Sequence, residues 1–359
     1  MFEFLNTWLA NGGFWVAIPL IILGCAALIK GADFLVDGAS ALAKKYGVSD
    51  IVIGLTVVAF GTSMPEFVVN MVAVGQGSTE IAITNVLGSN IINIFVILGF
   101  TALIYPISSQ KSTRRFDIPF SLLAALLVLL FAVYNSPSWL QIEHIFNMNI
   151  ADPTLSDLGS IQMGQGNGGF ISGVGGSILL IFFLIFLWHN FKGIGSAPQT
   201  ESNEEYKPMS AKRALALIIG GLIGLVVGGE VIVKSATSIA QSLGVSDAII
   251  GLTVVALGTS LPELATSCMA AFKKNCDIAL GNVIGSNLFN IFFILGTSAC
   301  VKALPGYHGL ETDAMMAALG SVMVMLFVYL TKKHEIKRWH GAILLLTYAA
   351  YLTYRILSL

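Results

Sequence analysis

Ten stretches of mainly apolar residues, each about 20 residues long, run through this chain. A helix of that length crosses the hydrocarbon core of a bilayer. Only 11% of the 359 residues are charged, against about 25% in an ordinary soluble domain, which excludes a soluble enzyme, a nucleic-acid-binding protein and a disordered chain. The sequence therefore predicts an all-α polytopic membrane protein of ten transmembrane helices. The expected spans are residues 14–43, 47–74, 80–105, 116–134, 170–190, 213–242, 244–271, 277–302, 312–331 and 340–357.

The positions of Lys and Arg predict which side of the membrane each loop faces, because cytoplasmic loops are enriched in these residues. Fifteen of the 19 basic residues follow odd-numbered spans. They are Lys44, Lys45, Lys111, Arg114, Arg115, Lys192, Lys207, Lys212, Arg213, Lys273, Lys274, Lys332, Lys333, Lys337 and Arg338. We therefore expect a multi-pass protein of the cell membrane with cytoplasmic odd loops and both termini outside. The polar stretch 192–212 is then a cytoplasmic linker.

The chain repeats itself at an offset of 197 residues. Residues 47–66 and 244–263 are identical at 16 of 20 positions. The same offset relates Asn85, Ser89, Asn90 and Asn93 to Asn282, Ser286, Asn287 and Asn290.

The linker divides the chain into halves of five spans, 1–191 with the motif 54–93 and 213–359 with the motif 251–290. Because five is odd, the two halves run through the membrane in opposite senses. Inverted repeats with helices interrupted at matching positions are typical of secondary transporters whose binding site lies near the bilayer midplane.

Each repeat carries a polar, proline-containing segment inside an apolar span, residues 62–66 and 259–263. Proline removes a backbone donor and disrupts the turn before it, so we expect the carbonyls of Ala59, Thr62, Ala256 and Thr259 to be free to face a cation. Irregular backbone at membrane depth is tolerated where it is buried in protein or lines a cavity. The segments therefore mark a candidate site.

The polar residues of the repeats form a set of hard oxygen ligands. Such a set suits Ca²⁺, which takes six to eight oxygens, or Na⁺, and does not suit zinc or copper, which prefer nitrogen or sulfur. Two carboxylates would be neutralised by one divalent or two monovalent cations, which is a physical basis for exchange. The candidate ligands are Glu66, Glu263, Thr62, Ser63, Thr259, Ser260, Ser89, Ser286, Asn93 and Asn290 with the carbonyls of Ala59 and Ala256.

Several of these residues have simpler explanations. A single Ser or Thr in a membrane helix commonly packs or bonds its own helix, and a buried Glu can be a protonated hydrogen-bond donor. Asn85 and Asn282 fit a pore lining and helix–helix hydrogen bonding equally well. Lys30, Asp33 and Asp37 share one face of the first span, which favours local charge pairing.

The segments GTSMPE and GTSLPE, each followed by GSNxxN, resemble the two α-repeats of the cation/Ca²⁺ exchanger superfamily, and most closely those of prokaryotic Na⁺/Ca²⁺ exchangers with ten helices. The resemblance implies antiport of Ca²⁺ against Na⁺ by alternating access, with ion sites between the second, third, seventh and eighth helices. It implies that Glu66 and Glu263 are the central carboxylates and that the first and sixth helices slide against the rest. Several relatives have Asp where this chain has Asn290, which weakens a K⁺-cotransport interpretation.

The favoured hypothesis is a Na⁺/Ca²⁺ antiporter acting on these ions within the lipid bilayer. The alternatives are a Ca²⁺/H⁺ antiporter on the same scaffold and, in another class, a cation channel. We expect no cofactor, nucleic acid or obligate protein partner. An enzyme is disfavoured because Ser63 and Ser260 have no neighbouring His or Lys in the sequence to act as a base. The sequence suggests no function for the long connection 135–169.

Overall fold

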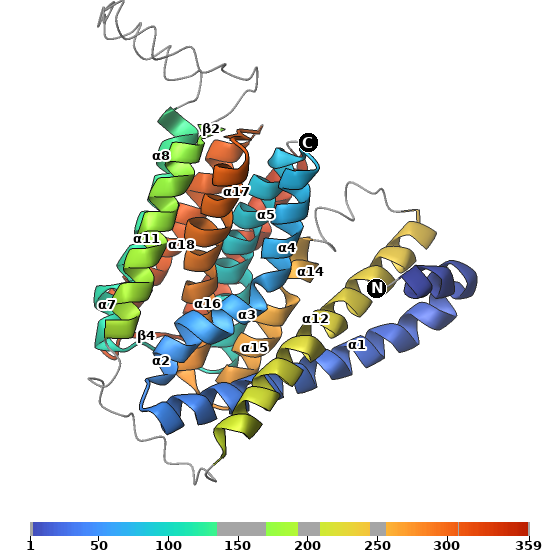
Figure 1. Cartoon of the computed structure of the whole chain (residues 1–359), viewed down its shortest axis with the longest axis horizontal. Coiled ribbons are helices and arrows are strands. Elements are labelled where there is room, and N and C mark those ends of the chain that lie inside the picture. The colour runs from blue at the N-terminus through green and yellow to red at the C-terminus, as the bar shows by residue number, and fades with distance from the viewer. Residues whose placement is uncertain (1–2, 135–169, 193–208, 245–255, 308, 358–359) are drawn as a thin grey trace, which may run out of the picture.

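The protein is a bundle of helices from which one long helix pair leans away (Figure 1). The structure is a computed structural model that describes residues 3–134, 170–192, 209–244, 256–307 and 309–357. The connection 135–169, most of the linker and residues 245–255 of the second motif lie outside the described residues. The uninterrupted helices are α1 (Glu3–Tyr46), α7 (Lys111–Arg115), α8 (Asp117–Tyr134), α11 (Gly173–Lys192), α12 (Ala211–Ser242), α18 (Leu310–Leu330) and α19 (Arg338–Leu357).

The spans that carry the repeat motifs are interrupted helices. The second expected span comprises α2 (Asp50–Ile53), η1 (Gly54–Val58), α3 (Ala59–Thr62) and α4 (Met64–Gly75), and its counterpart comprises α14 (Ala256–Thr259) and α15 (Leu261–Phe272). The third comprises α5 (Thr79–Ile92), η2 (Asn93–Ile97) and α6 (Leu98–Ile104). The eighth comprises α16 (Cys276–Leu288), η5 (Phe289–Leu295) and α17 (Gly296–Val301).

The expected all-helical membrane fold is confirmed, whereas the count of ten spans stays a prediction. Seven described helical stretches are long and apolar enough to cross a membrane, and the bent pair of residues 50–62 and 64–75 makes an eighth. The expected seventh span lies partly outside the described residues. The expected tenth span is the helix α19, but tyrosines such as Tyr348, Tyr351 and Tyr354 make it less apolar.

Two short strand pairs bring the loops together at two places. Strand β1 (Ile107–Ser108) pairs antiparallel with β4 (Glu335–Ile336) and so joins the loops after the expected third and ninth spans. Strand β2 (Phe170–Ile171) pairs antiparallel with β3 (Leu304–Pro305) and so joins the loops after the fourth and eighth. Odd loops therefore meet odd loops, and even loops meet even loops.

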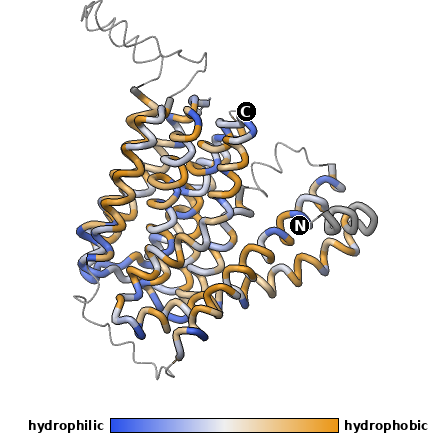
Figure 2. The backbone as a smooth tube through the Cα atoms, viewed as in Figure 1, coloured by the Kyte–Doolittle hydropathy of each residue, from blue (hydrophilic) through white to orange (hydrophobic). Residues whose placement is uncertain are grey.

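The interrupted third and eighth spans form the centre of the bundle. In their most apolar windows, 78% of the residues of 79–104 and 94% of those of 276–301 are buried, against 22% for α1. The outer helices instead expose large apolar side chains, as lipid-facing helices do, and are coloured as apolar along much of their length in Figure 2.

Helices α1 and α12 form the leaning pair, and glycines allow their backbones to touch. A Cβ added to Gly31 would lie 2.7 Å from the Gly221 carbonyl oxygen, and one added to Gly221 would lie 2.6 Å from that of Gly31. Gly24 and Gly228 make a similar close approach at a second point along the same two helices. Small residues at such crossings are the usual means of packing helices in lipid.

One lysine ties this helix pair to the bundle. Lys273, at the end of α15, lies 2.6 Å from Asp33 Oδ1 and 2.6 Å from Asp37 Oδ1. The expected local pair of Lys30 and Asp33 is present at 3.7 Å. The sequence prediction was thus right about local pairing but missed the closer partner, because Lys273 is 240 residues away from Asp33 along the chain.

The glycine contact gives a direct test of the packing. We expect Gly221→Ala to lower the thermal midpoint in detergent, because the added methyl group overlaps the Gly31 backbone at a cost of about 1–3 kcal/mol. Gly220→Ala is the matched control, since a Cβ at Gly220 has nothing within 4 Å and alanine favours a helix. Equal midpoints for the two variants in a thermal-shift assay would contradict the close packing.

Candidate functional site

The site is built around two helix breaks. The helix of the first motif bends by 46° between residues 50–62 and 64–75, and the second motif is interrupted at Ser260. Pro65 and Pro262 each lie in the first turn of the following helix, where a missing N–H costs nothing. The sequence prediction of proline-interrupted helices is confirmed.

The breaks position the two glutamates. Glu66 and Glu263 lie in the first turns of α4 and α15, where the helix dipole favours negative charge. Each residue is only 1% exposed. Ser63 Oγ donates to Glu263 Oε1 at 3.0 Å, so the two motifs meet although 200 residues separate these two side chains.

Four asparagines form a reciprocal network between the central helices. Asn93 Nδ2 donates to Asn287 Oδ1 at 2.9 Å, and Asn290 Nδ2 donates to Asn90 Oδ1 at 3.1 Å. Asn90 and Asn287 each donate to the other's backbone carbonyl at 3.3 Å. The network fixes the amide nitrogens of Asn93 and Asn290 and leaves their Oδ1 atoms buried without a hydrogen-bond partner.

Asn85 and Asn282 hold the helices that carry the glutamates. Asn85 Nδ2 donates to Asn70 Oδ1 at 2.6 Å, and Asn282 Nδ2 donates to Ser267 Oγ at 2.9 Å. Asn282 also bonds the backbone carbonyl of Glu263 and accepts from the Thr62 hydroxyl at 3.1 Å. Of the two explanations left open by the sequence, these contacts favour helix–helix hydrogen bonding.

The centre of the site contains oxygens that the protein itself leaves without hydrogen bonds. Buried polar atoms usually have a partner, so these oxygens are candidates for cation ligands. Among the described residues, no group of three His, Cys, Asp or Glu side chains forms a metal site, so hydroxyl and amide oxygens must complete any coordination shell. The unpartnered atoms include Glu66 Oε2, Glu263 Oε2, Asn93 Oδ1, Asn290 Oδ1, Ser260 Oγ and Ser286 Oγ.

The other predicted ligands include three buried side chains, and the prediction for one carbonyl was wrong. Thr62, Ser63 and Ser89 are buried. The Ala59 carbonyl was expected to be free, but it accepts the Ser63 N–H at 3.0 Å. Pro65 removes only the N–H that would reach the carbonyl four residues earlier, that of Gly61, so the Ala59 carbonyl keeps its helical hydrogen bond. Ala256 begins α14, and its side chain lies outside the described residues.

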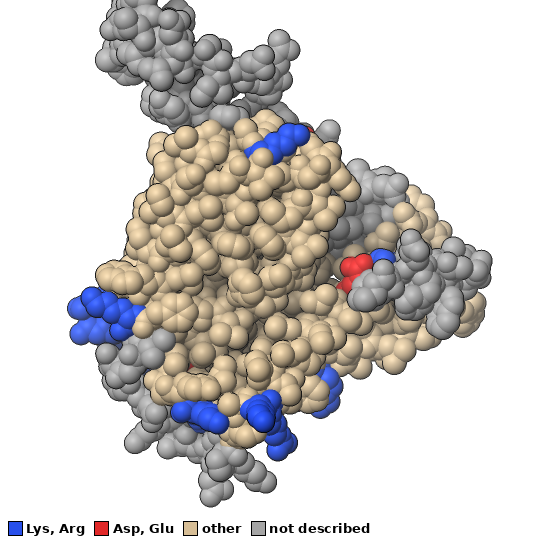
Figure 3. Space-filling view, viewed as in Figure 1, with Lys and Arg blue, Asp and Glu red and all other residues tan. Residues whose placement is uncertain are grey.

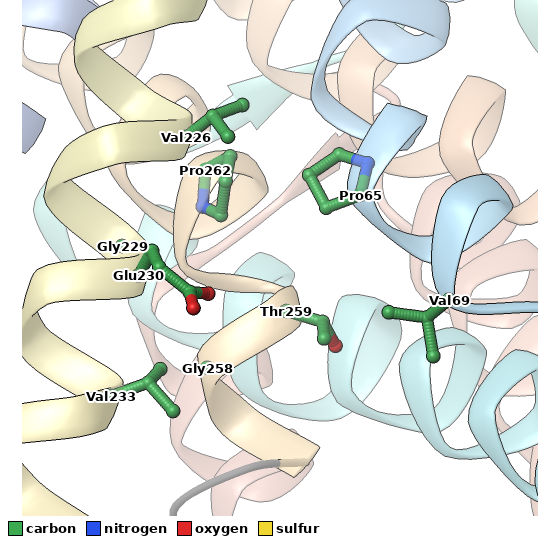
Figure 4. A pocket seen from close by; sticks show the side chains of 9 residues that line it. All are labelled: Pro65, Val69, Val226, Gly229, Glu230, Val233, Gly258, Thr259 and Pro262. Atoms are coloured by element: carbon green, nitrogen blue, oxygen red, sulfur yellow. The ribbon is translucent and has the colours of Figure 1, made fainter. Parts of the chain in front are cut away.

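A cavity of about 180 Å³ lies beside the breaks (Figure 4). Its walls come from α4, α12, α14 and α15, and Thr259 contributes a hydroxyl. Most of the lining is apolar, and the one charged lining residue is Glu230 of α12. The residues that line it are Pro65, Val69, Val226, Gly229, Glu230, Val233, Gly258, Thr259 and Pro262.

The structure adds features that the sequence interpretation missed. Asn90 and Asn287 are part of the aligned repeat, and their matching positions were the signal that could have identified them. The π-helical turns η2 and η5 begin at or next to Asn93 and Asn290. Such turns are frequent at functional sites, but nothing in the pattern of apolar residues distinguishes them from an α-helix.

Comparison with known proteins assigns the family. Residues 16–192 and 213–357 match the family model described as sodium/calcium exchanger protein. The sodium/calcium exchanger MaX1 of Methanosarcina acetivorans is 34% identical over 93% of this chain and 96% of its own length. The inner membrane protein YrbG of Escherichia coli is 32% identical over 80% of both chains.

A solved structure of the sodium–calcium exchanger NCX_Mj has the same fold, with a TM-score of 0.74 and 32% identity over 94% of this chain and 98% of the other. The buried oxygen site therefore sits in a transporter fold rather than an enzyme, and a resemblance first seen in two short motifs extends over most of the chain. The chain belongs to the sodium/calcium exchanger protein family of membrane antiporters.

Proposed function

We propose that this protein exchanges Ca²⁺ for Na⁺ across the cell membrane by alternating access, with Glu66 and Glu263 as its central cation-binding carboxylates. The observation that carries the proposal is the buried group of unpartnered oxygens around these two side chains. Each glutamate brings one negative charge. One Ca²⁺ or two Na⁺ ions would neutralise the pair, so Ca²⁺ and Na⁺ compete for the same two carboxylates.

The oxygens around the glutamates favour Na⁺ over H⁺ as the coupling ion. A proton binds one oxygen and needs no coordination shell, whereas Na⁺ and Ca²⁺ need several oxygens. The asparagine network supports a metal cation as the coupling ion. It uses the amide nitrogens of Asn93 and Asn290 and leaves their Oδ1 atoms available as ligands. The side chains of Ser63, Ser260 and Ser286 are also buried and carry hydroxyl oxygens.

The same arrangement favours a carrier over a channel. The glutamates are 1% exposed, so the site lacks the open water path that a permanent pore needs. The α1–α12 pair packs backbone to backbone and leans away from the rest of the bundle (Figure 1). Such a pair is a candidate for the element that moves when access alternates.

We infer a topology of ten spans in two inverted halves, residues 1–191 and 213–359, joined by a cytoplasmic linker at 192–212. Two observations support it: the reciprocal asparagine bonds at an offset of 197, and the strand pairs that join odd loops with odd and even with even. In Figure 3 most of the visible Lys and Arg atoms lie at the lower end of the molecule. By the positive-inside rule that end faces the cytoplasm and both termini lie outside.

The glutamates give the first functional prediction. In proteoliposomes loaded with Na⁺, the wild-type protein should take up radiolabelled Ca²⁺ down the outward Na⁺ gradient. We expect Glu66→Gln and Glu263→Gln each to reduce this uptake by about a hundredfold or more, because removing one partner from a buried charge group costs about 3–5 kcal/mol. The exposed Glu80 provides the matched control, and Glu80→Gln should transport normally.

Two further measurements separate binding from folding and Na⁺ from H⁺. Added Ca²⁺ should raise the thermal midpoint of the wild-type protein by mass action and leave that of Glu263→Gln unchanged. An outward H⁺ gradient without Na⁺ should drive no uptake. Uptake that follows the H⁺ gradient and ignores Na⁺ would instead establish the Ca²⁺/H⁺ alternative, and currents far above carrier turnover would establish a channel.

The asparagine network gives a second prediction. Asn290→Asp adds a third carboxylate and removes the amide that donates to Asn90 Oδ1, while the Asn93–Asn287 bond remains. We expect transport to be retained with a lower KM for Ca²⁺ relative to Na⁺, since an added charge attracts a divalent ion more strongly. Competition assays over a series of Na⁺ concentrations measure this shift. A variant that folds but transports nothing would refute the assigned role of Asn290.

A further inference from the structure

Glu230 is a carboxylate outside the central site that faces the cavity beside it. It lies on α12 and lines the cavity with Thr259 and the two motif prolines, Pro65 and Pro262. In Figure 4 its carboxylate points from α12 toward Thr259. The side chain is 40% exposed, so it is accessible to an ion from outside, unlike the buried glutamates. Figure 3 shows acidic atoms in the hollow between the helix pair and the bundle.

The cavity walls strengthen the field of this charge. Val69, Val226 and Val233 present apolar surface around it. A cleft with low-dielectric walls and one sign of charge focuses field lines and raises the local concentration of the opposite ion. Glu230 can therefore concentrate a cation at the place where the cavity meets the helix breaks.

A lysine moderates this charge. Lys234 Nζ lies 3.3 Å from Glu230 Oε1, one turn further along α12, and is 27% exposed. A cation that approaches Glu230 therefore competes with a tethered ammonium group. The attraction of Glu230 grows with the charge of the ion, so a divalent cation competes with Lys234 better than a monovalent one.

Comparison of the two repeats sets Glu230 apart from its aligned counterpart. At the offset of 197, Glu230 corresponds to Asp33, and Lys273 corresponds to Gln76. Asp33 is held by Lys273 at 2.6 Å in the contact between α1 and the bundle, whereas Glu230 pairs with Lys234 of its own helix at 3.3 Å. The equivalent acidic residues thus have different surroundings, one an ion pair between helices and the other a cavity wall.

We propose that Glu230 is the access carboxylate for the transported divalent cation and that Lys234 sets how strongly it attracts this cation. The inference rests on the proposed exchange function. The ion contacts Glu230 on its way to the site and dissociates from it before reaching Glu66 and Glu263. It therefore governs the capture of Ca²⁺ and not the turnover of the loaded carrier.

The test is the KM for Ca²⁺ in Na⁺-driven uptake at low and at high ionic strength. At low ionic strength we expect Glu230→Gln to raise KM about threefold to tenfold with little change in maximal rate, and Lys234→Met to lower KM. Both shifts should shrink at high ionic strength, because salt screens an exposed charge. Glu230→Asp keeps the charge and should restore most of the lost affinity.

Lys30→Met is the matched control, since Lys30 forms a similar ion pair with Asp33 on α1 but does not line the cavity. It should leave KM unchanged. Right-side-out and inverted membrane vesicles separate the two faces, and the effect should be confined to the face that carries the cavity.

The possible failures are distinct. No Na⁺-driven uptake by the wild-type protein would contradict the proposed function itself. Normal wild-type exchange with the same low-salt KM in Glu230→Gln would overturn only the access role. A fall in maximal rate with unchanged KM would also overturn it, because Glu230 would then act in the conformational change.

Discussion

Two carboxyl groups at the centre of an apolar bundle determine what the rest of this structure must provide. A charged side chain at the middle of a membrane helix costs about 3 kcal/mol even on the most lenient scales, and two close together repel. The lysines Lys30, Lys234 and Lys273 form ion pairs with other acidic residues. Under the proposed function, a bound cation supplies the counter-charge for Glu66 and Glu263, and the transported ion then also stabilises the site.

The asparagines solve a second problem, which is to orient neutral ligands without adding charge. An amide offers both a donor and an acceptor, and either end could face the ion. The network engages Nδ2 of Asn93 and Asn290 with Asn287 and Asn90, so the oxygen end of each amide has no hydrogen-bond partner. Because each half supplies the partner for the other, neither half can form the site alone. The asparagine network thus depends on both halves of the chain.

Much of this could be predicted from sequence because it depends on local rules. Apolar length predicted the helices, proline predicted the breaks before Glu66 and Glu263, and the 197-residue offset predicted that the two motifs act together. What could not be predicted depends on contacts between distant residues. Lys273 finds Asp33 only once α15 packs against α1. The expectation of a free Ala59 carbonyl was wrong for a local reason, because Pro65 removes the bond to Gly61 and the Ser63 N–H still reaches Ala59.

The aligned positions at which the two repeats differ distinguish the two halves of the chain, whereas the identical positions do not. If the two halves were identical, both faces of the bundle would be equivalent and neither would be preferred for capture of an ion. The candidate ligands are nearly identical in the two halves, so they would not distinguish the faces. The difference lies on the α1–α12 pair, where Asp33 is bound by Lys273 and its counterpart Glu230 lines a cavity. Under the proposed function, directional properties should therefore be sought in these unmatched charges, and the ion chemistry in the matched oxygens.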